Sequence, residues 1–183
     1  MVNQSIWIGI TVGVFFAGLA IGIVPNVMEK TMEEDTDLSN LEEVPNKTIT
    51  RLQPDELFDS RTLGFTQVVI APPGQTIYIT GQGAIDKDLQ IVGDTMEEQM
   101  DFAFKNVKSA LEASGAKPEH VVQIVMLMVD YDESYLPLVQ KERLEFFGND
   151  NLPASTLIHV PSLAIDGMLF EIQVTAVIPL NNP

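Results

Sequence analysis

The stretch that decides the fold is Leu152–Val177, LPASTLIHVPSLAIDGMLFEIQVTAV. It opens with a Pro-Ala pair, enters an apolar, β-branched run, crosses a turn and finishes in a second run of the same kind. Two such runs on either side of turn residues predict two strands. We expect these strands to pair as a hairpin that completes a small domain. One acidic residue, Glu171, lies early in the second strand.

The residues before this stretch predict the remainder of an α+β domain. Their apolar periodicity indicates four strands and two helices. The strands are expected at residues 48–52, 67–70, 76–80 and 121–129, and the helices at residues 95–114 and 134–147. Gly81-Gln82-Gly83 is expected to end the third strand. The all-apolar run of the fourth predicts a central strand that is covered on both faces.

The two helices carry the clearest local signals. Thr95 and Glu98 have capping-box spacing at the start of the first helix. Its apolar stripe consists of Met96, Met100, Ala103, Phe104, Val107 and Leu111. The stripe expected for the second helix consists of Leu138, Leu144 and Phe147, and Arg143 is expected on its solvated face. This order places two helices on one face of a mostly antiparallel sheet, and a self-complementary oligomer is the ordinary way to cover the other face.

Residues 6–24, IWIGITVGVFFAGLAIGIV, form an apolar run near the start of the sequence. As a helix this run would span about 28 Å, close to the roughly 30 Å hydrocarbon core of a bilayer. We interpret residues 1–24 as a single-pass membrane anchor. A cleaved signal peptide with a small-residue site at Gly18-Leu19-Ala20 is the alternative. No Lys or Arg precedes the run, which favours the retained anchor.

Residues 25–46 are rich in acidic side chains and have little periodicity, which predicts a flexible linker between the anchor and a folded domain at 47–183. An anchor so near the start usually behaves as a signal-anchor, so we expect the domain on the extracytoplasmic side of the membrane. The sequon Asn46-Lys47-Thr48 agrees with that side, because glycosylation takes place only there.

Composition restricts the partners and the chemistry. The net charge of −16 argues against a basic surface that could hold nucleic acid, and solubility or adaptation to salt is its simplest explanation. The chain has no cysteine, so it has no disulfide, no thiol nucleophile and no cysteine metal site. Its two histidines, His120 and His159, lack metal-site spacing. We therefore expect no metal.

Several short motifs between Leu63 and Val177 follow one another in a distinctive order. They are Gly64-Phe65-Thr66-Gln67, Thr80-Gly81-Gln82, Asn106-Val107-Lys108, Glu145-Phe146-Phe147, Pro153-Ala154 and Glu171-Ile172. In this order and spacing they resemble the RidA/YjgF family, also labelled the L-PSP endoribonuclease family. The resemblance implies a chorismate-mutase-like fold and a homotrimer with ligand clefts between its subunits. Enzymes of the family hydrolyse reactive imines and enamines without a cofactor, so the resemblance implies no cofactor here.

The resemblance also implies a set of site residues. Glu171 resembles the glutamate with which family enzymes position water, so it is the expected catalytic residue. The expected ligand cleft consists of Phe65, Thr80, Gly81, Gln82, Gln140, Ser155 and Leu157. Ser155 stands where family enzymes carry the arginine that grips the substrate carboxylate, and a hydroxyl cannot replace that charge.

Strand alternation places Ser155, Leu157 and His159 on one face of their strand. Ser155 and His159 are about 13 Å apart along this strand. That distance is too long for the hydrogen bond between a nucleophile and its base, so we do not expect the two residues to form a serine–histidine catalytic pair.

We therefore expect a membrane-anchored, RidA-like trimer that binds a small molecule and has weak or altered imine and enamine hydrolase activity. Two alternatives stay open. The protein could be a structural or accessory subunit of a membrane protein complex, or an orthodox 2-iminobutanoate/2-iminopropanoate deaminase.

Overall fold

The computed structural model of the protein describes residues 48–180. The anchor expected at residues 6–24 and the linker expected at 25–46 lie outside the described residues, as does the asparagine of the sequon. Within residues 48–180, no helix has both the length and the apolar character needed to cross a bilayer.

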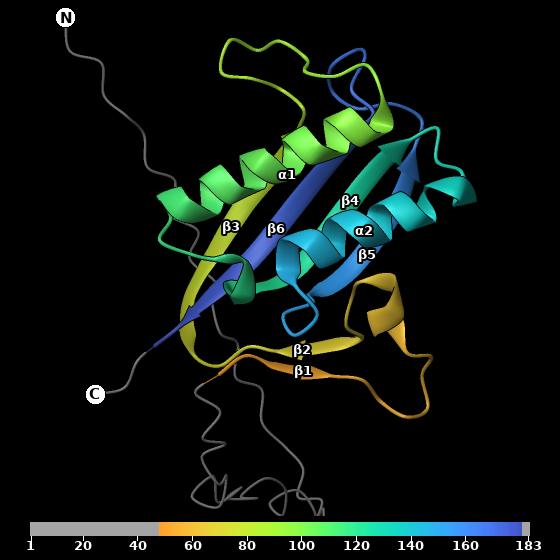
Figure 1. Ribbon diagram of the computed structural model, residues 1–183. Helices are drawn as coiled ribbons and strands as arrows, with labels where there is room; N and C mark the ends of the chain where they lie inside the picture. Colours follow the sequence, from red (N-terminus) through yellow and green to blue (C-terminus); the bar gives the residue numbers. More distant parts are fainter. Residues whose placement is uncertain (1–47, 181–183) are drawn as a thin grey trace, which may run out of the picture. The chain divides into compact units, whose positions relative to one another are not determined.

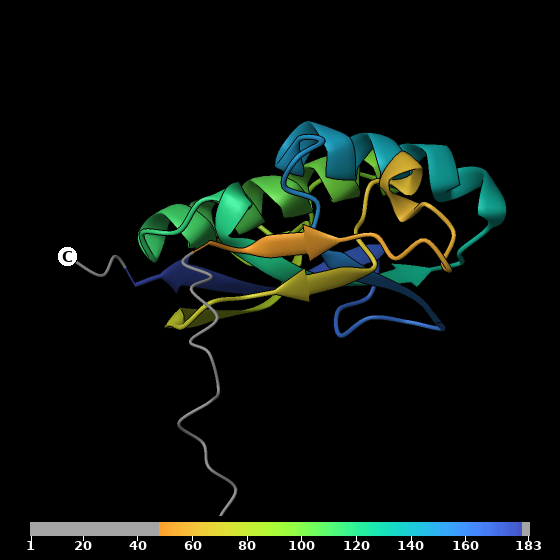
Figure 2. The ribbon, with the colours of Figure 1, turned by 90° about the horizontal axis from the view of Figure 1, so that it is seen from below.

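Two helices cover one face of a four-stranded sheet, and a two-stranded sheet lies at its side (Figure 1). Viewed from below, both helices lie on the same side of the strands (Figure 2). The helices are α1 (Met96–Ala113) and α2 (Leu136–Phe147). The large sheet contains β3 (Gly74–Gly83), β6 (Phe170–Pro179), β4 (Val121–Val129) and β5 (Ala154–Val160), in that order. The small sheet pairs β1 (Thr50–Leu52) with β2 (Val68–Ile70), and short 3-10 turns are η2 (Ser60–Leu63), η3 (Pro118–His120) and η4 (Glu133–Tyr135). The predicted α+β fold with two helices on one face is confirmed.

The predicted hairpin between the last two strands is wrong. β4 lies between β5 and β6, so the two strands are not neighbours. β5 runs parallel to β4, whereas β6 is antiparallel to both β3 and β4. The reason is α2, which connects β4 to β5 as a crossover and thereby returns the chain in the same direction. The sheet is therefore mixed.

Helix α1 confirms its sequence signals. The Thr95 hydroxyl accepts a hydrogen bond from the Glu98 N–H at 3.3 Å, and the Glu98 carboxylate accepts one from the Thr95 N–H at 3.1 Å. The Glu98 carboxylate also accepts hydrogen bonds from the Asp94 N–H and the Thr95 hydroxyl, and these two bonds, together with the one from the Thr95 N–H, hold the pKa of Glu98 below its usual range. All six residues of the predicted stripe are buried.

The predicted stripe of α2 is shifted. Phe147 is buried as expected, but Leu138 and Leu144 are only partly buried. Val139 and Arg143 are buried instead, four positions apart and in line with Phe147. The placement of Arg143 on a solvated face is thus wrong, because its exposed fraction is 5 %.

The face of the sheet away from the helices is partly open in the single chain. In β4, Ile124, Met126 and Met128 are fully buried against the helices, whereas Val125 and Leu127 on the other face are half-buried. Other strands of the sheet expose large apolar side chains on this face, including Tyr78 of β3 at 79 % and Ile158 of β5 at 41 %. The expectation that β4 is covered on both faces is therefore not met within one chain.

One buried side chain ties two loops to α1. Gln99 is 1 % exposed, and its Nε2 donates to the carbonyls of Gly93 at 3.1 Å and Gly167 at 2.8 Å. Its Oε1 accepts from the Leu169 N–H at 2.8 Å. Gln99 thereby holds the loop before α1 and the loop before β6 in place on the same helix.

Candidate functional site

A small pocket lies between α2, β5 and the segment that follows η2. Its volume is about 150 Å³, and its walls are mostly apolar. It is lined by Leu63, Phe65, Leu136, Val139, Arg143, Ser155 and Leu157. Three of the seven predicted cleft residues, Phe65, Ser155 and Leu157, thus meet here. The pocket is below the usual range of drug-sized sites, so it suits a small metabolite better than a nucleotide.

Arg143 is the residue of this pocket that the sequence analysis missed. It comes from the middle of α2, and its Nη1 donates to the Leu63 carbonyl at 3.1 Å. The centre of the guanidinium lies 5.4 Å from the centre of the Phe65 ring, within the range of a cation–π contact. Its Nε is buried and has no hydrogen-bond partner among residues 48–180. Burial lowers the pKa of Arg143 to about 10, so the side chain remains charged at neutral pH.

Ser155 presents the second polar atom of the pocket. Its Oγ is buried and, within the described part of the chain, has no hydrogen-bond partner. Ser155 lies opposite Ile124 in the parallel pairing of β5 with β4, and Leu157 lies opposite Met126. Because Ile124 and Met126 face the helices, Ser155 and Leu157 face them as well.

Gln140 lies beside this pocket rather than in its wall. Its Nε2 donates to the Thr62 carbonyl at 2.5 Å, which holds η2 against α2. Gly64 permits the close approach, since its φ is +80° and a Cβ there would lie 3.0 Å from the Cβ of Arg143. Gln140 and Gly64 therefore position the wall that Leu63 and Phe65 form.

The other predicted site residues gather at a different place. Glu171 lies opposite Gly83 and Leu127 in the sheet, and therefore on the face away from the helices. Its carboxylate covers Gly81, where a Cβ would lie 2.0 Å from Oε1. This close contact explains the small residue in β3. Gly81-Gln82-Gly83 was expected to end this strand, but β3 includes all three residues. The pairing of β3 with β6 instead shifts in register between Ile79 and Gln82.

Thr80, Gly81 and Gln82 thus lie beside Glu171, and Phe65, Ser155 and Leu157 lie together on the opposite face of the sheet. Within one chain the two halves of the predicted cleft do not meet.

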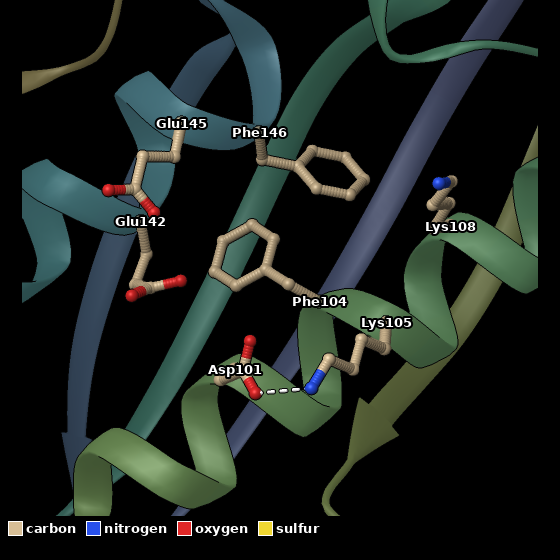
Figure 3. Close-up of a pocket in the computed structure, with 7 residues that line it drawn as sticks. All are labelled: Asp101, Phe104, Lys105, Lys108, Glu142, Glu145 and Phe146. Carbon is tan, nitrogen blue, oxygen red and sulfur yellow. Dashed lines mark hydrogen bonds and ion pairs between the residues drawn. The ribbon is translucent and has the colours of Figure 1, made fainter.

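A second hollow runs between α1 and α2 (Figure 3). The rings of Phe104 and Phe146 form its floor, with centroids 5.1 Å apart. The Lys105 ammonium pairs with Asp101 at 2.5 Å. On α2, burial raises the pKa of Glu142, and the Lys141 ammonium at 3.4 Å partly offsets this effect. The charges of Asp101 and Lys105 are thereby paired, as is that of Glu142 with Lys141, whereas Lys108 and Glu145 form no ion pair within residues 48–180.

Neither histidine contributes to a site. His159 is exposed at the end of β5, and the His120 Nδ1 accepts a hydrogen bond from the Lys117 N–H at 3.2 Å. Residues 48–180 contain no group of three or more His, Asp or Glu side chains that could hold a metal ion.

The sequence model of the family described as endoribonuclease L-PSP matches residues 60–178. The chain therefore belongs to this family, which is the RidA/YjgF family of the resemblance.

Known proteins agree with this assignment. A 2-iminobutanoate/2-iminopropanoate deaminase of Dermatophagoides farinae is 30 % identical over 91 residues, which cover 49 % of this chain and 69 % of that protein. A RutC family protein of Saccharolobus solfataricus is 31 % identical over 104 residues, covering 56 % of this chain and 79 % of the relative. Among solved structures, a Rid family protein of unknown function from Yersinia pestis superimposes with a TM-score of 0.69 at 26 % identity. The match covers 72 % of this chain and 99 % of that one.

Proposed function

We propose that this domain binds a small imine- or enamine-type molecule and hydrolyses it weakly, in a cleft that a second copy of the chain completes. The observation that carries the proposal is the pocket beside Ser155, which follows the family's Pro-Ala pair and has Phe65 as a wall. The similarity to a 2-iminobutanoate/2-iminopropanoate deaminase supports this class of substrate.

The opposite placement of Ser155 and Glu171 supports a cleft between subunits. One chain cannot bring the two residues to the same ligand, because they lie on opposite faces of the sheet. A homotrimer, in which the open face of one subunit packs beside the pocket of the next, would join them and would also cover Tyr78 and Ile158. In such a cleft the Glu171 carboxylate would position the attacking water as a general base.

The test is hydrolysis of 2-iminobutanoate by the full chain purified in mild detergent. We expect slow turnover by a trimer, and Glu171→Gln is expected to reduce it by about 100-fold, in the range of a lost general base. The matched control is Gln173→Glu, which places a carboxylate on the same face of β6 two residues away. Sedimentation measures the oligomer. Turnover that is unchanged in Glu171→Gln would remove this residue from the mechanism, and an active monomer would remove the intersubunit cleft.

We further propose that residues 6–24 anchor the protein in a membrane with the domain on the extracytoplasmic side. The support for the anchor is the length and apolar character of this run, and the sequon Asn46-Lys47-Thr48 supports the extracytoplasmic side. Protease added to intact cells is expected to release the domain, while the anchor stays in the membrane fraction. A domain that is cut only after the cells are opened would reverse the orientation, and a mature protein that starts after Ala20 would show a signal peptide instead.

A further inference from the structure

Arg143 is a buried cation without a matching anion. Arginine is rarely buried unless it is paired, because moving the charge out of water is unfavourable. Within residues 48–180 no carboxylate forms an ion pair with it, although the whole chain has 26 acidic residues and only 10 basic ones. Its partners are one carbonyl and one aromatic ring, and its Nε has none. The anion that would satisfy this group is absent from the described chain.

The pocket around Arg143 indicates the kind of anion. Five of its seven lining residues are apolar, which suits a short hydrocarbon chain. The two polar residues are Arg143 and Ser155, and each has a buried polar atom without a partner. A single guanidinium and one hydroxyl match the two oxygens of a monocarboxylate. A phosphate has more charge and more acceptors than these donors can satisfy.

We propose that Arg143, reaching into the pocket from α2, binds the carboxylate of a small monocarboxylic acid whose apolar chain lies among Leu63, Phe65 and Leu157. The guanidinium therefore occupies the same pocket as Ser155 but comes from a different element of the fold. Ser155 Oγ adds one hydrogen bond to the bound acid. This inference rests on the proposed function only in placing the ligand in the same pocket, since it requires binding and not turnover.

The test compares two probes of equal shape, butanoate and its neutral amide butanamide, titrated into the full chain and followed by NMR. We expect butanoate to bind at least ten-fold more tightly than butanamide. Arg143→Met is expected to bring butanoate down to the level of the amide. Arg143→Lys is expected to keep the preference for butanoate with weaker binding, because an ammonium has the charge without the planar fork. Arg61→Met is the matched control, as Arg61 is exposed and paired with Asp59, and it should bind as the unaltered chain does.

Three results would overturn the inference. The first is equal affinity for butanoate and butanamide in the unaltered chain, which needs no variant to fold. The second is a preference for butanoate that persists in folded Arg143→Met. The third is inorganic phosphate that displaces butanoate at equal concentration, which would make the pocket a general anion site. The two proposals can fail separately. If the protein prefers butanoate but does not hydrolyse the imine, carboxylate binding by Arg143 stands and the proposed hydrolase activity fails. If the protein hydrolyses the imine but does not prefer butanoate, the hydrolase activity stands and the role of Arg143 fails.

Discussion

Replacing Gln99 with leucine is expected to lower the free energy of unfolding by about 3–5 kcal/mol. The substitution removes three hydrogen bonds and leaves two carbonyls and one N–H of the adjoining, partly buried loops without a protein partner. Each buried group without a partner destabilises the fold by about 1–3 kcal/mol, and leucine cannot replace either the donor or the acceptor. Urea unfolding followed by circular dichroism measures the change.

The control for this prediction is Gln75→Leu, in which the same side chains are exchanged at an exposed position of β3. We expect a change within about 0.5 kcal/mol there, as for most surface substitutions. A Gln99→Leu protein as stable as the control would mean that the two loops reach their positions without this side chain. Because the loop after β5 leads directly to Glu171, the variant should also lose activity when it is still folded.

Placing an arginine at Ser155 is expected to destabilise the protein by about 3–5 kcal/mol, the usual effect of an uncompensated buried charge. The new side chain would enter a pocket of about 150 Å³ that already contains the guanidinium of Arg143. Two cations would then lie in one small, mostly apolar space. From the sequence alone, Ser155→Arg would simply restore the family's arginine. Because Arg143 already lies in the pocket, we expect a loss of stability instead.

The double variant Arg143→Leu with Ser155→Arg tests whether the loss of stability comes from two cations in one pocket. It returns the pocket to a single guanidinium, now on β5, and we expect it to recover most of the stability and the preference for butanoate over butanamide. His159→Arg, an exposed position on the same face of the same strand, is the control and should be nearly neutral. If Ser155→Arg alone is stable and hydrolyses 2-iminobutanoate faster than the unaltered chain, Arg143 does not supply the positive charge of this pocket.

The two helices and β4 were predictable because each is specified by its own residues. Thr95 and Glu98 begin α1, and the apolar run of β4 spans residues 121–129 in both the prediction and the structure. The neighbours of a strand depend on the whole sheet, and for that reason the hairpin was wrong. The parallel pairing of β4 with β5 was nevertheless predictable from the helix between them, because a strand, a helix and a second strand in succession favour parallel pairing.

The misplacement of Arg143 has a similarly specific cause. Lys-Glu-Arg-Leu-Glu has the composition of a solvated helix face, and this composition conceals the buried position of its arginine. Helical spacing from Phe147 back through Arg143 to Val139 would have placed the arginine on the buried side. Glu171 and Ser155 were likewise treated as one cleft, although only the pairing of both strands with β4 reveals that they face opposite ways.

The position of β6 has a consequence for how the protein is made. β6 is the last strand of the domain, yet it lies between β3 and β4, and Gly74 pairs with Pro179 across more than half of the chain. Such distant pairings make folding slow, because the intervening chain must close before the contacts form. Until β6 has left the ribosome, β3 and β4 have no partner between them and expose unpaired edges that favour aggregation. This domain therefore completes its sheet only after its last strand has been synthesised.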